Sequence, residues 1–406
     1  MREYSAFFFF FFFRLKWICK IKYPCVILLW RWIKMKKKYI TFSIVTLVLL
    51  VALITSFNYF KTTNTYIDDS VNNQTKITKG ISMNLEQTAG AGDYKTVTQS
   101  GWPTEGYKFN AELSKCEKGS TLSWDDTKKA VIVSGNLSDK CYVYFDIYQP
   151  TLAEYIKSQY TGTQGDNALY YHNSTLTNGA GDNSYRYAGA SDSVNNYICL
   201  GSDEATCPDA NLFRIIGVFG DQTKVIRAKS IGNQKWDTNN SNTWSSSSLN
   251  TYLNGEYLTS LGTIAEKIAT TTWKVGGRSS TYLYDVPTTA YQYEVGSSAS
   301  TTTYDAKIGL MYVSDYGFAA DQSGWTTKLS SYGSNSSKNW LYLGSAEWTI
   351  SRNSRLTGLA FTVTGTGYVN YTSVTLSRGV RQSFNLESSV KYVSGSGSMS
   401  DPVRVN

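Results

Sequence analysis

The 406-residue chain has little of the chemistry that most enzymes and metal sites use. It contains one histidine, six cysteines and six prolines, and only 17% of its residues are charged, against ~25% in average soluble proteins. No Gly-x-Ser-x-Gly motif accompanies His172, so the usual pairing of a nucleophile with an imidazole base is missing. The sequence therefore indicates no catalytic residues, no metal ligands and no cofactor, and His172 is expected to be structural or at the surface.

Positive charge is scarce outside the N-terminus. Ten of the 39 lysines and arginines, but one of the 31 acidic residues, lie in residues 1–38. The rest of the chain is close to neutral, although the whole carries a formal charge of +8. A neutral domain lacks the basic footprint that binding a phosphate backbone requires. We therefore expect no nucleic-acid partner.

One long uncharged segment runs from Tyr39 to Phe60. Its length suits the ~30 Å hydrocarbon layer of a membrane. Four lysines stand between residues 34 and 38, and the positive-inside rule places them in the cytoplasm. The sequence predicts a signal-anchor helix over residues 35–60, membrane contact through residues 39–60 and an extracellular C-terminal part. A cleaved signal peptide is the alternative, although its apolar core is usually shorter.

The residues before this anchor have an unusual composition. Phe7–Phe13 is a run of one residue type, and a basic, aromatic stretch follows it. Met35, with three lysines and an apolar core after it, has the form of an ordinary signal-anchor start. Residues 1–34 are therefore interpreted as a mis-assigned start or as a basic cytoplasmic segment.

The part beyond the anchor divides by composition into three segments. Residues 61–99 are mostly polar and are interpreted as a linker or stalk. Residues 100–149 hold four strand-like runs, GYKFNAEL, STLSWDD, KKAVIVSG and KCYVYFDIY, separated by turn residues. They predict a small all-β module. Residues 150–406 form the main domain.

Patterns in the main domain predict both helices and strands. Thr151 and Glu154 form a capping box ahead of a helix over residues 151–160. Residues 212–219 and 223–230 predict a hairpin, and residues 246–261 a helix. Strand-like runs follow, among them KIGLMYVSD, NWLYLG and EWTISR. Mixed strands with one or two helices indicate an α+β domain.

Four cysteines follow the anchor: Cys116, Cys141, Cys199 and Cys207. An even number outside the membrane favours disulfides. Because each pair lies within one expected module, we predict Cys116–Cys141 and Cys199–Cys207. Zinc is the alternative, but it usually takes four Cys or His ligands at close spacing.

An ordered set of motifs in the second half of the chain resembles a family of bacterial surface domains of unknown function. The motifs are NLFRII, TWSSSSLNTYLNGEYL, EWTISR, RGVRQSFNL and SGSGSMSDPVRV, and the resemblance covers residues 150–406. That family is similar to the C-type-lectin-like fold, which lectins, formylglycine-generating enzymes and hypervariable bacterial receptors share. The resemblance implies a mixed-sheet domain of this kind.

Three departures limit what the resemblance implies. The Glu-Pro-Asn, Gln-Pro-Asp and Trp-Asn-Asp elements of calcium-dependent lectins are missing, so calcium-dependent sugar binding is not implied. Cys199 and Cys207 do not match the paired active-site cysteines of the formylglycine-generating enzymes. Gln382 stands where family members usually have proline after Gly-Val-Arg.

Together these features predict a non-catalytic binding or adhesion protein on the surface of a Gram-positive-type bacterium, with a glycan or protein ligand. The fold resemblance implies a ligand face in the loops near residues 340–378, where aromatic and planar polar side chains gather. The expected binding residues are Trp340, Tyr342, Arg352, Asn353, Arg355, Tyr368, Asn370 and Tyr371. Trp348 and Arg381 are expected in the core.

Two other functions stay open. A cell-envelope hydrolase needs two carboxyl groups across a cleft, which sequence alone does not exclude. A structural surface or pilus-like component is the other, although no Leu-Pro-x-Thr-Gly sorting signal is present.

Overall fold

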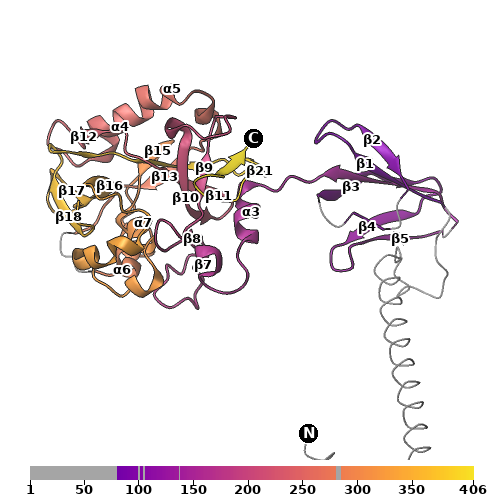
Figure 1. Cartoon of the computed structure of the whole chain (residues 1–406), viewed down its shortest axis with the longest axis horizontal. Helices are drawn as coiled ribbons and strands as arrows, with labels where there is room; N and C mark the ends of the chain where they lie inside the picture. The colour runs from indigo at the N-terminus through magenta and orange to yellow at the C-terminus, as the bar shows by residue number, and fades with distance from the viewer. Residues whose placement is uncertain (1–79, 99–100, 104–105, 137, 280–284) are drawn as a thin grey trace, which may run out of the picture. The chain divides into compact units, whose positions relative to one another are not determined.

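The computed structural model describes residues 80–98, 101–103, 106–136, 138–279 and 285–406 (Figure 1). The chain divides into two compact units, Met1–Tyr148 and Gln149–Asn406. The predicted anchor over residues 35–60 and the segments 1–34 and 61–79 lie outside the described residues. Within the described part, no helix is long and apolar enough to span a membrane.

The first unit is built from β-strands. β1 (Ile81–Glu86), β2 (Tyr94–Val97), β3 (Tyr107–Cys116) and β6 (Cys141–Ile147) form a four-stranded sheet in the order β2-β1-β6-β3. β4 (Thr121–Asp125) and β5 (Ala130–Ser134) pair as a hairpin. Alternate side chains of β6 are buried, and Phe145 among them contacts the rings of Trp102, Phe109 and Trp124. All four strands predicted for this module are confirmed.

The prediction of a linker over residues 61–99 is wrong for residues 81–97, which form β1 and β2. β1 pairs in parallel with β6 at the centre of the sheet. Its sequence, ISMNLE, alternates apolar and polar residues, which is a strand signal that the linker prediction overlooked, and the polar Asn84 and Glu86 are buried as well. Asn84 donates to the Val143 carbonyl (3.3 Å), and the Glu86 carboxylate accepts from the Ile147 amide (2.9 Å).

Both predicted disulfides are present. Cys116 and Cys141 stand opposite each other on the antiparallel strands β3 and β6, with Cα atoms 4.0 Å apart. Cys199 and Cys207 close a short loop in the second unit. Each bridge therefore lies within one unit, as expected from the order of the cysteines.

The second unit is mixed α+β, and its largest sheet has nine strands. The strands are β7 (Leu169–Tyr171), β8 (Tyr185–Tyr187), β9 (Tyr197–Cys199), β10 (Leu212–Phe219), β11 (Gln222–Arg227), β15 (Ile308–Leu310), β20 (Gln382–Leu386), β21 (Tyr392–Ser394) and β22 (Val403–Val405). The main path is β15-β20-β11-β10-β9-β22-β21, and β8 joins β7 to β10. β10 and β11 confirm the predicted hairpin.

A five-stranded sheet follows the order β12-β19-β16-β17-β18. Its strands are β12 (Asn233–Lys235), β16 (Glu347–Arg352), β17 (Leu359–Val363), β18 (Val369–Ser373) and β19 (Ser377–Gly379), and β13 (Thr271–Lys274) pairs separately with β14 (Thr303–Ala306). The predicted strand NWLYLG is wrong, since these residues form a turn. The side chain of Asn339 directs that turn inward by donating to the Tyr316 carbonyl (2.8 Å).

The expectation of only one or two helices is wrong. The described residues form α3 (Leu152–Ser158), α4 (Ser248–Tyr252), α5 (Leu258–Ser260), α6 (Pro287–Glu294) and α7 (Val313–Phe318). The described part of the unit also contains one π turn, η4 (Leu253–Tyr257), and six 3₁₀ segments. The 3₁₀ segments are η1 (Asp166–Ala168), η2 (Asp209–Asn211), η3 (Trp244–Ser246), η5 (Gly262–Lys267), η7 (Gln322–Gly324) and η8 (Leu329–Lys338). The capping box of α3 is confirmed, with both reciprocal bonds between Thr151 and Glu154.

The core of the second unit is rich in tryptophan. Trp236, Trp244, Trp273, Trp325, Trp340 and Trp348 are all at most 2% exposed. Their indole N–H groups mostly donate to backbone carbonyls, as Trp236 does to Thr349 and Trp348 to Gln234. A buried tryptophan with a bonded N–H adds large apolar burial and keeps its polar atom satisfied. The loops of the second unit are therefore attached to a well-packed core.

The two ends of the second unit meet, as the neighbouring labels α3 and β21 in Figure 1 show. The amide of Leu152 donates to the Val390 carbonyl (2.8 Å), and that of Tyr392 to Pro150 (2.9 Å). The rings of Tyr155 and Tyr392 stack at 3.7 Å between centroids. Segments from the start and the end of the unit thus form one clasp.

Candidate functional site

The eight residues expected to bind ligand lie in the core, at two ends of the five-stranded sheet and on its edge strand β18. Trp340 is 1% exposed, and its indole donates to the Tyr187 carbonyl (2.8 Å). Asn353 is also 1% exposed, and its Oδ1 accepts from the amides of Arg355 and Leu356 (3.0 Å each). Both side chains serve packing and turn formation, so neither is presented to a ligand.

The remaining six residues do not converge. Tyr342 donates to the Gly365 carbonyl (2.7 Å), beside the turn that leads to the exposed Tyr368. Arg352 and the exposed Arg355 lie at the opposite end of the sheet, where β16 leads into β17. The five-residue strand β17 separates the two ends by roughly 15 Å at ~3.3 Å per residue.

Asn370 and Tyr371 lie between these ends, on the edge strand β18. Asn370 is exposed, whereas Tyr371 is half-buried and its ring meets that of Phe361 (6.0 Å between centroids). The residues of the predicted face are therefore spread along a sheet rather than gathered around a cavity.

Trp348 and Arg381 are core residues, as expected. Both are 1% exposed. Arg381 forms a bidentate pair with Glu347, with Nε and Nη2 each 2.8 Å from a carboxylate oxygen. Neighbouring Gln382 is fully buried and donates to the hydroxyl of Tyr257.

A different part of the second unit forms a surface pocket of about 570 Å³. One wall consists of Ser191, Asp192, Val194, Asn195 and Tyr197, which lead into β9, and the other of residues 398–400. Two segments far apart in the chain thus line one open pocket.

The backbone holds these two segments together. The amide of Tyr197 donates to the Gly397 carbonyl (2.8 Å), and β9 pairs in parallel with β22 just beyond. Gly397 has a φ of +82°, and a Cβ there would stand 2.5 Å from the carbonyl oxygen of Asn195. Only glycine combines this conformation with so close an approach. This explains the glycine at position 397, within the SGSGSMSD stretch.

Asp401 braces the second wall from within. Its carboxylate accepts from the amide of Ser396 (2.8 Å), and its carbonyl from that of Gly397 (3.0 Å). Its own amide donates to the Ser398 hydroxyl (3.1 Å). These bonds hold residues 398–400, the second wall, in a defined turn, in which Met399 is 62% exposed.

A buried cation lies beneath the first wall. Arg214 of β10 is 3% exposed, and its guanidinium group donates to the Ser191 hydroxyl (2.7 Å), the Asn196 side chain (2.6 Å) and the Val194 carbonyl (3.0 Å). It also stacks 4.2 Å from the ring centre of Tyr197. Burial lowers the pKa of Arg214 to about 10, so the group stays charged at neutral pH. The planar guanidinium group of Arg214 therefore holds residues 191–196 in place through several hydrogen bonds at once.

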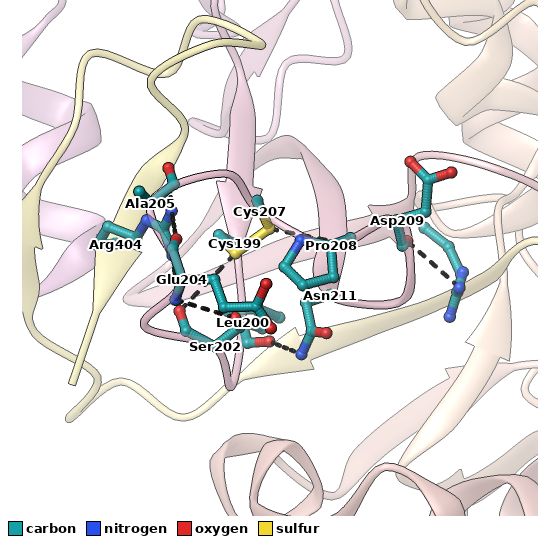
Figure 2. The surroundings of a disulfide bond; sticks show 11 residues. Cys199, Leu200, Ser202, Glu204, Ala205, Cys207, Pro208, Asp209, Asn211 and Arg404 are labelled. Carbon is teal, nitrogen blue, oxygen red and sulfur yellow. Dashed lines mark hydrogen bonds between the residues drawn. A yellow bond between two sulfur atoms is a disulfide. The ribbon is translucent and has the colours of Figure 1, made fainter.

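The Cys199–Cys207 disulfide fixes the other end of β9 (Figure 2). Arg404 of β22 donates to the carbonyls of Ser202 (2.6 Å) and Glu204 (2.7 Å). The side chain of Asn211 donates to the Leu200 carbonyl (2.6 Å). β9 is thus held at both ends, which limits movement of the pocket wall.

The chemistry of the pocket suits a ligand rich in hydroxyl groups. Serine hydroxyls, the Asp192 carboxylate and the Asn195 amide offer both donors and acceptors. Tyr197 and Met399 add apolar contact surface, whereas Val194 is 1% exposed and belongs to the core. The residues that line the pocket include the Asp192 carboxylate and no lysine or arginine, which disfavours anionic ligands. In the described ranges, no group of three or more His, Cys, Asp or Glu side chains is placed to hold a metal ion.

None of the pocket residues was predicted from the sequence as a binding residue. The only local signal was the SGSGSMSDPVRV motif, which supplies one wall. The opposite wall lies in a loop rich in Ser, Asn and Asp that resembles any surface loop. No protein-family model, no curated protein and no solved structure matches this chain.

Proposed function

We propose that this protein is a non-catalytic binding or adhesion protein, held at the outer face of a Gram-positive-type membrane by residues 39–60. Its ligand is a neutral glycan, bound in the pocket between residues 191–197 and 398–400. The observation that carries the proposal is the pocket itself. Hydroxyl, amide and carboxylate groups lie around the ring of Tyr197 there. Hydrogen bonds to Arg214 and within the backbone hold both walls in place.

The lining of this pocket combines polar and apolar groups, as ligand sites usually do. Such sites are concave and largely preformed, and a few placed polar groups among apolar atoms provide specificity. A preformed wall also lowers the entropy lost on binding. Arg214, Gly397 and Asp401 provide that preformation here.

Three features support the location outside the cell. The uncharged segment 39–60 with its preceding lysines has the pattern of a signal anchor. Two disulfides follow it in the chain, and disulfides persist mainly in oxidising compartments. The second unit also has few charges for its size and many Ser, Thr, Asn and Tyr residues, as is common for surface proteins.

We further propose the C-type-lectin-like fold for residues 150–406. The motifs that carry the resemblance all contribute to one unit, with NLFRII in β10, EWTISR in β16 and RGVRQSFNL across β19 and β20. The last motif, SGSGSMSDPVRV, forms a wall of the pocket and then β22.

The test is glycan binding by the full-length protein, first on an array of neutral oligosaccharides and then by calorimetry with the best ligand. Asp192→Ala removes an exposed acceptor from the pocket rim. Losing one hydrogen bond of ~1–2 kcal/mol should weaken binding about five- to thirtyfold. Asp203→Ala, an exposed aspartate in the disulfide loop, is the matched control and should leave the affinity unchanged.

Tyr371→Ala and Arg355→Ala distinguish the pocket from the face predicted from sequence. Both variants should bind as the wild type does. If they lose binding while Asp192→Ala keeps it, the ligand occupies the edge of the five-stranded sheet and the pocket assignment is wrong.

A further inference from the structure

A lysine and an aspartate are in direct contact inside the second unit. Lys224 of β11 and Asp315 of α7 are 91 residues apart, and Nζ lies 2.5 Å from Oδ2. The two residues are 5% and 3% exposed. A nitrogen this close to one carboxyl oxygen is also close to the carboxyl carbon, the atom that an amine attacks.

Aromatic rings enclose the lysine nitrogen. Nζ lies 4.7 Å from the ring centre of Tyr312, 5.4 Å from Trp273 and 5.8 Å from Phe219. In such surroundings both charged forms are costly. Burial lowers the pKa of Lys224, and the Asp315 carboxylate opposes this shift. The neutral amine, which is the nucleophilic form, is therefore more accessible than in an exposed lysine.

A second ion pair stands beside the first. Arg186 donates to Asp182 (2.6 Å), while its Nη1 lies 3.6 Å from Oδ1 of Asp315. The cluster contains one cation for each anion. If Lys224 and Asp315 lost their charges together, Arg186 and Asp182 would still neutralise each other.

Both buried carboxylates of this region help to cap α7. Oδ2 of Asp315 accepts from the Tyr312 amide (2.8 Å) as well as from Lys224. Glu294 accepts from the amides of Val313 and Ser314 at the start of α7 and from the hydroxyl of Ser351. Its oxygens are thus used to cap the helix, which leaves the contact between Lys224 and Asp315 undisturbed.

We propose that Lys224 and Asp315 form an intramolecular isopeptide bond after the chain has folded. One proton first passes from the Lys224 ammonium to the Asp315 carboxylate across their contact. The neutral amine then attacks the carboxyl carbon Cγ, and an N–C bond forms. A second proton leaves the nitrogen and joins the departing hydroxide, so that one ammonium and one carboxylate give one amide and one water. No oxidant, reductant or further reactant is consumed.

The surroundings favour this condensation. The guanidinium group of Arg186 faces Oδ1 of Asp315, where negative charge develops in the tetrahedral intermediate, and such fixed charges stabilise the transition state. Enclosure by the aromatic rings limits water, which would reverse the reaction. The product replaces two buried charges by a neutral amide.

The bond would join two layers of the unit. β11 is an inner strand of the nine-stranded sheet, between β10 and β20, while α7 contacts β16 and β17 of the five-stranded sheet (Figure 1). An extracellular protein would gain a covalent link that reducing agents do not open.

Peptide mapping of the full-length protein tests the proposal. After denaturation, reduction, alkylation and digestion with trypsin, the peptide of residues 215–227, uncleaved after Lys224, and the peptide of residues 308–328, which contains Asp315, should appear as one branched species. Its mass should equal the sum of the two linear peptides less one water. Trypsin should not cleave after Lys224, because an acylated lysine is not a substrate.

Variants complete the test. Lys224→Met and Asp315→Ala should yield only linear peptides, while Lys229→Met, an exposed lysine paired with Asp209, should keep the branch. Should either of the first two variants fail to fold, the wild-type map still decides. Linear wild-type peptides cleaved after Lys224 would overturn the proposal, as would loss of water confined to Asp315.

Discussion

The buried pair of Arg381 and Glu347 allows a quantitative prediction. Both side chains are 1% exposed, and Arg381 also donates to the Leu341 carbonyl (2.5 Å). Arg381→Met retains an apolar stem but leaves Glu347 without its cation. Removing one partner of a buried pair costs about 3–5 kcal/mol, a large part of the ~5–15 kcal/mol that stabilises a typical protein. For a unit of this size the melting temperature should fall by roughly 6–20 °C.

The loss should depend on pH. Burial raises the pKa of Glu347, and Arg381 opposes this, so the variant should have a Glu347 pKa well above that of the unfolded chain. A group whose pKa is raised on folding contributes stability that is fully present below the unfolded pKa, about 4.3. That stability is lost as the pH rises through the folded pKa. Arg381→Met should therefore lie further below the wild type at pH 8 than at pH 5.

Urea unfolding followed by tryptophan fluorescence measures both effects, since the second unit holds the six buried tryptophans. Adding Glu347→Gln to Arg381→Met removes the unpaired charge and should restore part of the loss at pH 8. Arg378→Met, a half-exposed arginine three residues earlier, is the control and should stay within about 0.5 kcal/mol of the wild type. A variant within 1 kcal/mol of the wild type at pH 8 would refute this reasoning.

Two further predictions concern stability. Trp348→Ala should cost about 3–5 kcal/mol, because it empties a fully buried site and leaves the Gln234 carbonyl unpaired; a melting temperature close to that of the wild type would show that the site repacks. Burial between Phe318 and Trp325 holds the pKa of His172 well below its usual range, and Arg186 adds to the effect. In the unfolded chain His172 takes up a proton near pH 6.5, whereas in the folded chain it stays neutral. The free energy of unfolding should therefore fall as the pH drops below that value. His172→Phe should reduce this slope in urea unfolding at pH 7.5 and 5, and an unchanged slope would assign it to other groups.

The sequence predicted best those elements that local interactions determine. The capping box at Thr151 and Glu154 forms α3 because both of its hydrogen bonds lie within one turn. The hairpin of β10 and β11 has two apolar runs separated by a two-residue turn, so its partner is its neighbour in the chain. Local pairing also explains why both disulfides could be inferred from the order of the cysteines.

Elements that depend on distant partners were missed. β1 was missed because the polar composition around it indicated a linker, although ISMNLE alternates apolar and polar residues, and its buried Asn84 and Glu86 find their partners in and beside β6. α7 begins within KIGLMYVSD, a run that resembles a strand, and the amides of its first turn donate to Glu294, which comes from α6. Neither partner can be recognised from the residues on either side.

The ligand face shows the same limit. Composition correctly marked residues 340–378 as rich in Trp, Tyr, Asn and Arg, but it could not show which side chains point inward. Trp340 is drawn into the core by the Tyr187 carbonyl and the guanidinium of Arg214. The pocket arises only when the start of β9 meets the loop before β22, and their contact depends on the backbone of Gly397.

The clasp between the ends of the second unit has a mechanical consequence. The pocket lies on the segments that lead into β9 and β22, and β22 is paired with β21, which binds the chain at Pro150 and contacts α3. A pulling force applied between a bound ligand and residue 150 would therefore travel a short route through α3, β21, β22 and β9. The tryptophan core lies off that route, so tension would load a few interstrand bonds first while the remainder of the unit stayed unstrained.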